Sequence, residues 1–136
     1  MRAITLLISL VLLETGCDSV NVQQYRIAAA SGGDRAKVKG VLRSVAKQLS
    51  LEDRTSISRA PKTLVFYIEP NVEHFAVQLG ARGSDGDVLI DLNAGFGPRP
   101  RKDVEAERLL ASGLASEFGP RATLVEHPDT IRRASQ

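Results

Sequence analysis

Residues 74–92 read HFAVQLGARGSDGDVLIDL and contain two runs in which apolar and other residues alternate. A period of two is typical of β-strands that bury one face. Between the runs lies a Gly-Ser-Asp-Gly segment, residues 83–86, whose glycines accept the positive φ of a tight turn. The stretch therefore predicts an antiparallel hairpin. Its alternating apolar positions are Phe75, Val77 and Leu79 in the first strand, and Val88, Ile90 and Leu92 in the second.

Residues 63–69 also alternate with a period of two, but both alternating sets are apolar. We therefore expect a central strand that is covered on both faces, ended by Pro70-Asn71. Another strand is expected near the start of the domain, at residues 20–30. Its alternation slips at Gln23-Gln24, which is compatible with a bulge or with a strand that starts near Val22. Residues 51–61 are polar and turn-rich and predict a connector.

A first amphipathic helix follows Ser31 or Asp34, either of which offers a helix cap. Its apolar residues recur with the spacing of one buried helical stripe: Val38, Val41, Leu42, Val45 and Leu49. Gly40 lies inside this helix and costs about 1 kcal/mol relative to alanine. A close contact between this helix and the sheet would explain the glycine.

A second helix is expected to begin after Asp103 as its cap and to end at Gly119-Pro120. Its apolar stripe consists of Ala106, Leu110, Leu114 and Phe118. Residues 122–126 predict a short last strand. Residues from Pro128 onward predict a flexible tail.

The predicted order of elements is β-α-β-β-β-α-β. Two helices with one apolar stripe each are best buried on the same face of a mainly antiparallel sheet. We therefore predict a two-layer α+β sandwich, a variant of the ferredoxin-like β-α-β-β-α-β order with one added strand. Residues 17–127 form one domain in this interpretation, followed by the tail at 128–136.

Composition argues against several classes of function. The formal net charge is +2, and the chain has four Phe, two Tyr and no Trp. A nucleic-acid surface usually carries a clustered basic patch, and single-stranded nucleic acids need exposed rings for stacking. We therefore expect no nucleic-acid partner.

The N-terminus predicts export. Arg2 precedes an apolar segment at residues 3–13, which is too short to span a bilayer but suits the core of a signal peptide. The segment ends in Thr15-Gly16-Cys17, which contains the only cysteine of the chain. We therefore expect residues 1–16 to be a signal peptide that is removed.

Thr15-Gly16-Cys17 after a leucine-rich run resembles the lipobox of bacterial lipoprotein precursors. The resemblance covers residues 1–18 and implies that Cys17 becomes the acylated N-terminus of a periplasm-facing protein. Asp18 resembles the signal that retains some lipoproteins in the inner membrane, so the choice between the two membranes stays open. The alternatives are an exported soluble protein without an anchor, or a small buried thiol at Cys17.

The remaining chain shows no reactive constellation. His74 and His127 lack the spacing of a zinc site or a nucleophile pair, and no serine lies in a nucleophile motif. Asp85, Asp87 and Asp91 lie close in sequence but lack the EF-hand spacing, and the last two are expected to face solvent. We therefore predict neither enzyme activity nor a metal or cofactor.

A basic connector is the candidate for partner binding, because binding residues often lie on loops of a rigid scaffold. It runs from Asn93 to Lys102, and its candidate residues are Gly95, Phe96, Gly97, Arg99, Arg101 and Lys102. The leading hypothesis is a lipoprotein whose domain binds an unknown envelope protein or supports envelope assembly. One alternative is an inhibitor or immunity lipoprotein directed against an envelope-acting enzyme or toxin. A second is a small-ligand-binding protein with a pocket between helices and sheet.

Overall fold

A computed structural model describes residues 21–71, 76–94 and 100–125 of the chain. Its elements are, in order, β1 (Asn21–Ile27), α2 (Gly32–Gln48), β2 (Glu52–Asp53), the 3-10 turn η1 (Thr55–Ile57), β3 (Thr63–Ile68), β4 (Gln78–Ser84), β5 (Asp87–Ala94), α3 (Pro100–Phe118), the 3-10 turn η2 (Gly119–Arg121) and β6 (Ala122–Val125). Neither helix in these ranges combines the length and the apolar character that crossing a membrane requires.

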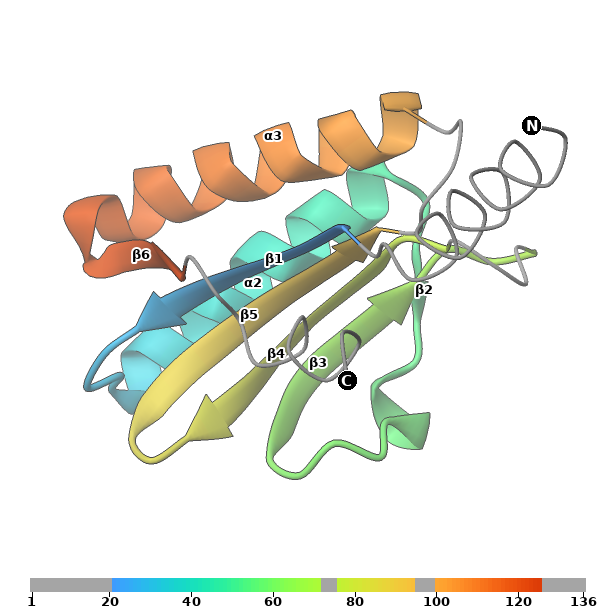
Figure 1. Ribbon diagram of the computed structural model, residues 1–136. Coiled ribbons are helices and arrows are strands. Elements are labelled where there is room, and N and C mark those ends of the chain that lie inside the picture. Colours follow the sequence, from blue (N-terminus) through green and yellow to red (C-terminus); the bar gives the residue numbers. More distant parts are fainter. Residues whose placement is uncertain (1–20, 72–75, 95–99, 126–136) are drawn as a thin grey trace, which may run out of the picture.

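Within the described residues, six strands form one sheet in the order β2-β3-β4-β5-β1-β6. Every pair of neighbouring strands is antiparallel. Figure 1 shows α2 and α3 side by side on the same face of this sheet. The predicted two-layer α+β sandwich is therefore confirmed.

The short strand β2 was not predicted, because residues 51–61 were interpreted as a connector. Glu52 and Asp53 pair with Ile68 and Tyr67 at the end of β3. From the alternating directions of the antiparallel strands, β2 runs parallel to β1, and β6 runs parallel to β5. Each helix therefore connects two parallel strands, as in the ferredoxin-like order. In that order two strands lie between the helices in the sequence. Here four strands do, and they form the antiparallel meander β2-β3-β4-β5.

Helix α2 begins where the sequence predicts a cap. Ser31 Oγ accepts a hydrogen bond from the Asp34 backbone N–H at 3.1 Å, and Asp34 Oδ2 accepts one from the Ser31 backbone N–H at 2.9 Å. This reciprocal pair is a capping box, which satisfies two of the free N–H groups at a helix start. All five residues of the predicted apolar stripe of α2 are buried.

Helix α3 begins at Pro100, so the prediction that Asp103 caps it is wrong by one turn. Proline suits the first turn of a helix because its missing N–H would have no partner there. The predicted stripe is confirmed, since Ala106, Leu110, Leu114 and Phe118 are all buried. Gly119 has a φ of 55°, as expected for the left-handed residue that ends a helix.

The two helices pack closely against each other at Gly113 of α3. A Cβ atom on Gly113 would lie 2.8 Å from Cγ1 of Val41 in α2, whereas a Cβ on Gly40 would have nothing within 4 Å. The expectation that Gly40 marks a close contact between helix and sheet is therefore wrong. The glycine that permits close packing lies in the other helix.

The hydrophobic core fills the space between the helices and the inner face of the sheet. Val65 and Tyr67 of β3 are buried in this core and Leu64 packs against it, but Phe66 and Ile68 are only half-buried on the opposite, outer face. The prediction of a central strand covered on both faces is therefore wrong. β3 lies next to the edge strand β2, and both helices lie on the inner face of the sheet, so no described helix covers the outer face of β3 (Figure 1).

The hairpin between β4 and β5 is confirmed, with Asp85 and Gly86 as its turn residues. Their φ angles are 50° and 86°, and two successive positive φ angles are what a two-residue turn of type I′ requires. β4 begins at Gln78, four residues later than predicted. β1 pairs with β5 in an unbroken register, so the slip at Gln23-Gln24 produces no bulge.

Candidate functional site

The outer face of the sheet is polar on its central strands, because alternation sends every second residue outward. In β5, Leu89, Asp91 and Asn93 are partly exposed on this face, while the residues between them are buried in the core. In β4, the outward positions hold Gln78, Gly80 and Arg82. The central strands thus present amides and charges on the side that no described helix covers.

One row of residues crosses the outer face at right angles to the strands. The cross-strand register places Phe66 opposite Gly80, Gly80 opposite Asp91, and Asp91 opposite Gln24. Gly80 has no side chain, so the row has a gap between the phenyl ring and the carboxylate. A Cβ on Gly80 would lie 3.4 Å from Cδ2 of Phe66, which shows how closely the ring borders this gap.

The gap opens into a cavity of about 490 Å³, which we call the outer-face hollow. This volume lies within the range of about 300–1,000 Å³ that is usual for ligand sites. Its floor comes from β3, β4 and β5, and its rim comes from residues 58–61. The outward side chains that line it are Phe66, Gln78, Arg82, Asp91 and Asn93.

A polar network fixes one side of the hollow. Gln24 Nε2 donates a hydrogen bond to Asp91 Oδ1 at 2.6 Å, and Arg82 Nε lies 3.5 Å from Asp91 Oδ2. Gln24 is only 6% exposed, so its amide is held in place. Both oxygens of Asp91 are therefore engaged by the protein itself. Among the described residues, no partner is seen for the two terminal nitrogens of Arg82.

The rim of the hollow is also held by hydrogen bonds. The hydroxyls of Ser58 and Thr63 lie 2.9 Å apart, and Thr63 Oγ1 donates to the carbonyl of Ala60 at 2.8 Å. The backbone N–H of Gly83 donates to the carbonyl of Lys62 at 3.0 Å. These contacts tie the loop that carries Ala60 and Pro61 to β3 and β4.

The lining residues supply recognition groups. A guanidinium donates in a planar fork, and the amides of Gln78 and Asn93 both donate and accept. Phe66 and Pro61 offer apolar surface beside them. The hydroxyls that line the hollow, from Ser58 and Thr63, are bonded to each other. No group of three or more potential metal ligands is found in the described ranges.

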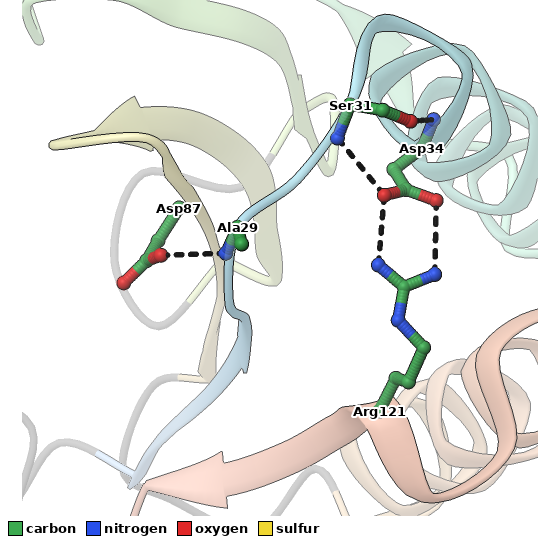
Figure 2. Close-up of polar contacts among 5 residues, drawn as sticks. All are labelled: Ala29, Ser31, Asp34, Asp87 and Arg121. Atoms are coloured by element: carbon green, nitrogen blue, oxygen red, sulfur yellow. Dashed lines mark hydrogen bonds and ion pairs between the residues drawn. The ribbon is translucent and has the colours of Figure 1, made fainter.

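A second polar cluster lies at the start of α2, where Ser31, Asp34 and Arg121 meet (Figure 2). Arg121 donates two hydrogen bonds to Asp34, from Nη1 to Oδ1 at 3.2 Å and from Nη2 to Oδ2 at 2.8 Å. These bonds, together with those from Ser31, hold the pKa of Asp34 well below its usual range. The cluster joins the start of α2 to η2, so we assign it a structural role and not a binding role.

Asp87 has a similar structural role. Its Oδ1 accepts a hydrogen bond from the Ala29 backbone N–H at 2.9 Å, and its Oδ2 accepts one from Arg26 Nε at 2.7 Å (Figure 2 shows the first bond). The Ala29 bond, followed by the Arg26 bond, lowers the pKa of Asp87. Asp87 and Asp91 were expected to face solvent, but each side chain is only 18% exposed. That expectation is wrong, because both carboxylates bind neighbouring strands.

Most residues of the predicted partner-binding connector lie outside the described residues: Gly95, Phe96, Gly97 and Arg99. Arg101 and Lys102 belong to α3. Lys102 Nζ lies 3.4 Å from Glu69 Oε1, so this base joins α3 to the end of β3. Cys17, Asp18, His74, His127 and the predicted tail at 128–136 also lie outside the described residues.

Sequence reasoning did not identify the outer-face hollow. The small or polar positions of residues 76–80 did indicate an uncovered face. This signal does not show that Gly80 and Asp91 are neighbours, because that depends on strand register. A scan against protein-family models finds no match to this chain, and a search of curated proteins finds none either.

Proposed function

We propose that this chain is a lipid-anchored, periplasm-facing protein of the bacterial envelope whose domain binds a partner protein without catalysis. The observation that carries the location is the Thr15-Gly16-Cys17 motif after a short apolar run. Two or three acyl chains on Cys17 would hold the protein on a membrane, since each buried CH₂ contributes about 0.8 kcal/mol. Asp18 resembles the signal that retains some lipoproteins in the inner membrane, and the proposal leaves the choice between the two membranes open.

The binding role is supported by the outer-face hollow. Sites that recognise other molecules usually combine apolar surface with a few polar groups in fixed positions. Here Phe66 supplies the apolar surface, and Arg82 forms an ion pair with Asp91. β1 begins at Asn21, so three residues separate it from Cys17. At about 3.5 Å per residue, this places the sheet within about 14 Å of the acyl anchor.

Intact-mass analysis of the protein purified from membranes tests the anchor, beside a Cys17→Ala variant. We expect the mass gain of a diacylglyceryl or triacyl group on a chain that begins at Cys17, and loss of this gain in the variant. Glu14 occupies the third position before Cys17, where lipoboxes usually carry an apolar residue. An unmodified chain in the envelope would show that Glu14 prevents processing, and it would overturn the proposed anchor.

Site-specific photo-crosslinking in intact cells tests the binding role. A crosslinker at Leu89, which lies opposite Arg82 on the outer face, is expected to capture a partner. The same crosslinker at Ser44, on the exposed side of α2, is the matched control. The adduct from Leu89 should disappear when Gly80→Val fills the hollow. Equal adducts from both positions, or an adduct that Gly80→Val leaves unchanged, would contradict binding at this face.

Binding of a small ligand is a second candidate function, because the hollow has a suitable volume of about 490 Å³. The sequence-based version of this hypothesis placed the pocket between helices and sheet. That space is occupied by buried side chains of the core, and the hollow lies on the other side of the sheet. The inhibitor alternative requires that the basic connector ending at Lys102 protrudes and binds a partner. Lys102 instead forms an ion pair with Glu69, so this base does not support that alternative.

A further inference from the structure

We infer that the outer-face hollow recognises a peptide segment of the partner that carries a carboxylate, with Arg82 binding the carboxylate and the gap over Gly80 seating the adjacent apolar residue. This inference rests on the proposed partner-binding function and names the chemistry of the partner. Three features of the hollow carry it: the guanidinium of Arg82 on one side of the gap, the gap itself beside Phe66, and the pair of amides from Gln78 and Asn93 on the other side of the gap.

The guanidinium of Arg82 contacts Asp91 through one of its three nitrogens. Its contact with Asp91 uses Nε and is long, at 3.5 Å. Asp91 cannot turn toward Arg82 freely, because Gln24 holds its other oxygen at 2.6 Å. The terminal nitrogens of Arg82 have no partner among the described residues, and its side chain is 33% exposed. A guanidinium fork of this kind fits a carboxylate with two parallel hydrogen bonds.

The gap over Gly80 provides the apolar part of the site. The Phe66 ring borders it on one side, and Pro61 and Ala60 contribute the rim. Gly80 lies next to Arg82 in the outward row of β4, two residues away along the strand. A ligand whose apolar group fills the gap can therefore reach Arg82 with its carboxylate only if the carboxylate lies close to that apolar group in the ligand.

The amides of Gln78 and Asn93 favour a peptide over a simple organic acid. These residues are cross-strand partners at one end of the hollow. Each amide has one acceptor oxygen and a donor NH₂ group, so a pair of them can meet the C=O and N–H of one peptide unit. A hydrocarbon acid would leave both amides without a new partner while it displaces their water.

Two-dimensional ¹H–¹⁵N NMR of the full-length labelled chain in detergent micelles tests the inference. The probes are acetyl-Ala-Leu-Ala with a free C-terminus, the same peptide with a C-terminal amide, and hexanoate. We expect the free acid to shift the amide resonances of Gly80, Arg82 and Asn93. It should bind about tenfold more tightly than the amidated peptide, the usual effect of losing hydrogen bonds to a charged group. Hexanoate should shift none of these resonances.

Arg82→Gln should abolish the difference between free acid and amide, whereas Arg35→Gln on the exposed side of α2 should preserve it. Gly80→Val keeps Arg82 but fills the gap, and it should abolish binding of both peptides. The spectra themselves show whether each variant is folded. Equal binding of acid and amide, or binding of hexanoate as tight as the free acid, would overturn the inference.

Photo-crosslinking distinguishes failure of carboxylate recognition from failure of the proposed partner binding. If the adduct from Leu89 is lost in Gly80→Val but kept in Arg82→Gln, the partner binds at the hollow without carboxylate recognition, and only the inference fails. If no adduct forms at Leu89, the proposed binding role itself fails.

Discussion

Gly113 of α3 packs so closely on Val41 of α2 that a Cβ at position 113 would lie 2.8 Å from Val41 Cγ1. Real Cβ atoms do not approach a neighbour this closely, so glycine is required for the observed spacing of the two helices. Val41 is β-branched and has one preferred rotamer in a helix, which limits its ability to move aside. At this point the spacing between α2 and α3 therefore depends on Gly113 and Val41.

Gly113→Ala should destabilise the protein although alanine favours helices. The added methyl group overpacks the contact with Val41, which typically costs about 1–3 kcal/mol. Gly40→Ala is the matched change in the other helix, where a Cβ meets nothing within 4 Å. It should stabilise by up to about 1 kcal/mol through helix propensity. Urea unfolding of the two variants should therefore shift the midpoint in opposite directions.

Val41→Ala combined with Gly113→Ala tests the cause of that cost. Removal of Cγ1 clears the space for the new methyl, so the double variant should be more stable than the sum of the two single changes predicts. Strict additivity in urea unfolding would show that Gly113 acts through some other contact.

Gly86→Ala should destabilise the β4–β5 hairpin. Gly86 has a φ of 86°, in the left-handed region that costs a residue with a Cβ about 1–2 kcal/mol. Gly33→Ala is the control, because Gly33 lies in the first turn of α2 and has ordinary helical geometry. Thermal unfolding should show a lower midpoint for Gly86→Ala alone, and equal midpoints would contradict the role of the turn.

Leu110→Ala should cost about 2–5 kcal/mol, because it removes a fully buried side chain and leaves a cavity. Leu110 is 0% exposed, whereas Leu124 on the edge strand β6 is 55% exposed. Leu124→Ala should therefore change the free energy of unfolding by about 0.5 kcal/mol or less. Similar costs for the two changes would mean that the edge of the sheet is covered in solution.

Asp34→Asn should lose stability at neutral pH but less so in acid. The pKa of Asp34 is lowered in the folded protein, mainly by hydrogen bonds from Arg121. A lowered pKa contributes stability that is present above the unfolded pKa of about 4 and is lost as the pH falls through the folded value. Urea unfolding from pH 7 down to pH 2 should show a constant gap between wild type and variant that narrows below about pH 4. A gap that widens in acid would contradict the assignment.

The fold could be predicted because its signals are local. The capping box at Ser31 and Asp34, the stripes of the two helices and the turn at Asp85-Gly86 each occupy a few neighbouring residues. β2 was missed because two residues cannot show a period, and Glu52 and Asp53 enter the sheet only by pairing with β3. The start of α3 was placed one turn late because the predicted cap, Asp103, lies inside a helix that Pro100 begins.

The candidate site could not be predicted in the same way. Gln24, Gly80 and Asp91 come from three strands and meet only through the register of the sheet. In the sequence, Gly80 looks only like a residue that weakens a strand. That it forms the floor of a hollow follows from Phe66, which lies opposite it in β3. By contrast, the prediction that Cys17 is acylated uses a contiguous motif and needs no folded contact.

The position of β1 has a mechanical consequence for a tethered domain. β1 lies between two neighbours, paired with β5 from Asn21 to Ile27 and with β6 from Gln24 to Ile27. An anchor at Cys17 would transmit tension along this strand, at right angles to the hydrogen bonds on both of its sides. Those bonds would then be loaded together in shear instead of opening one after another. A domain attached to the membrane in this way would resist unfolding by force better than one tethered through an edge strand or a terminal helix.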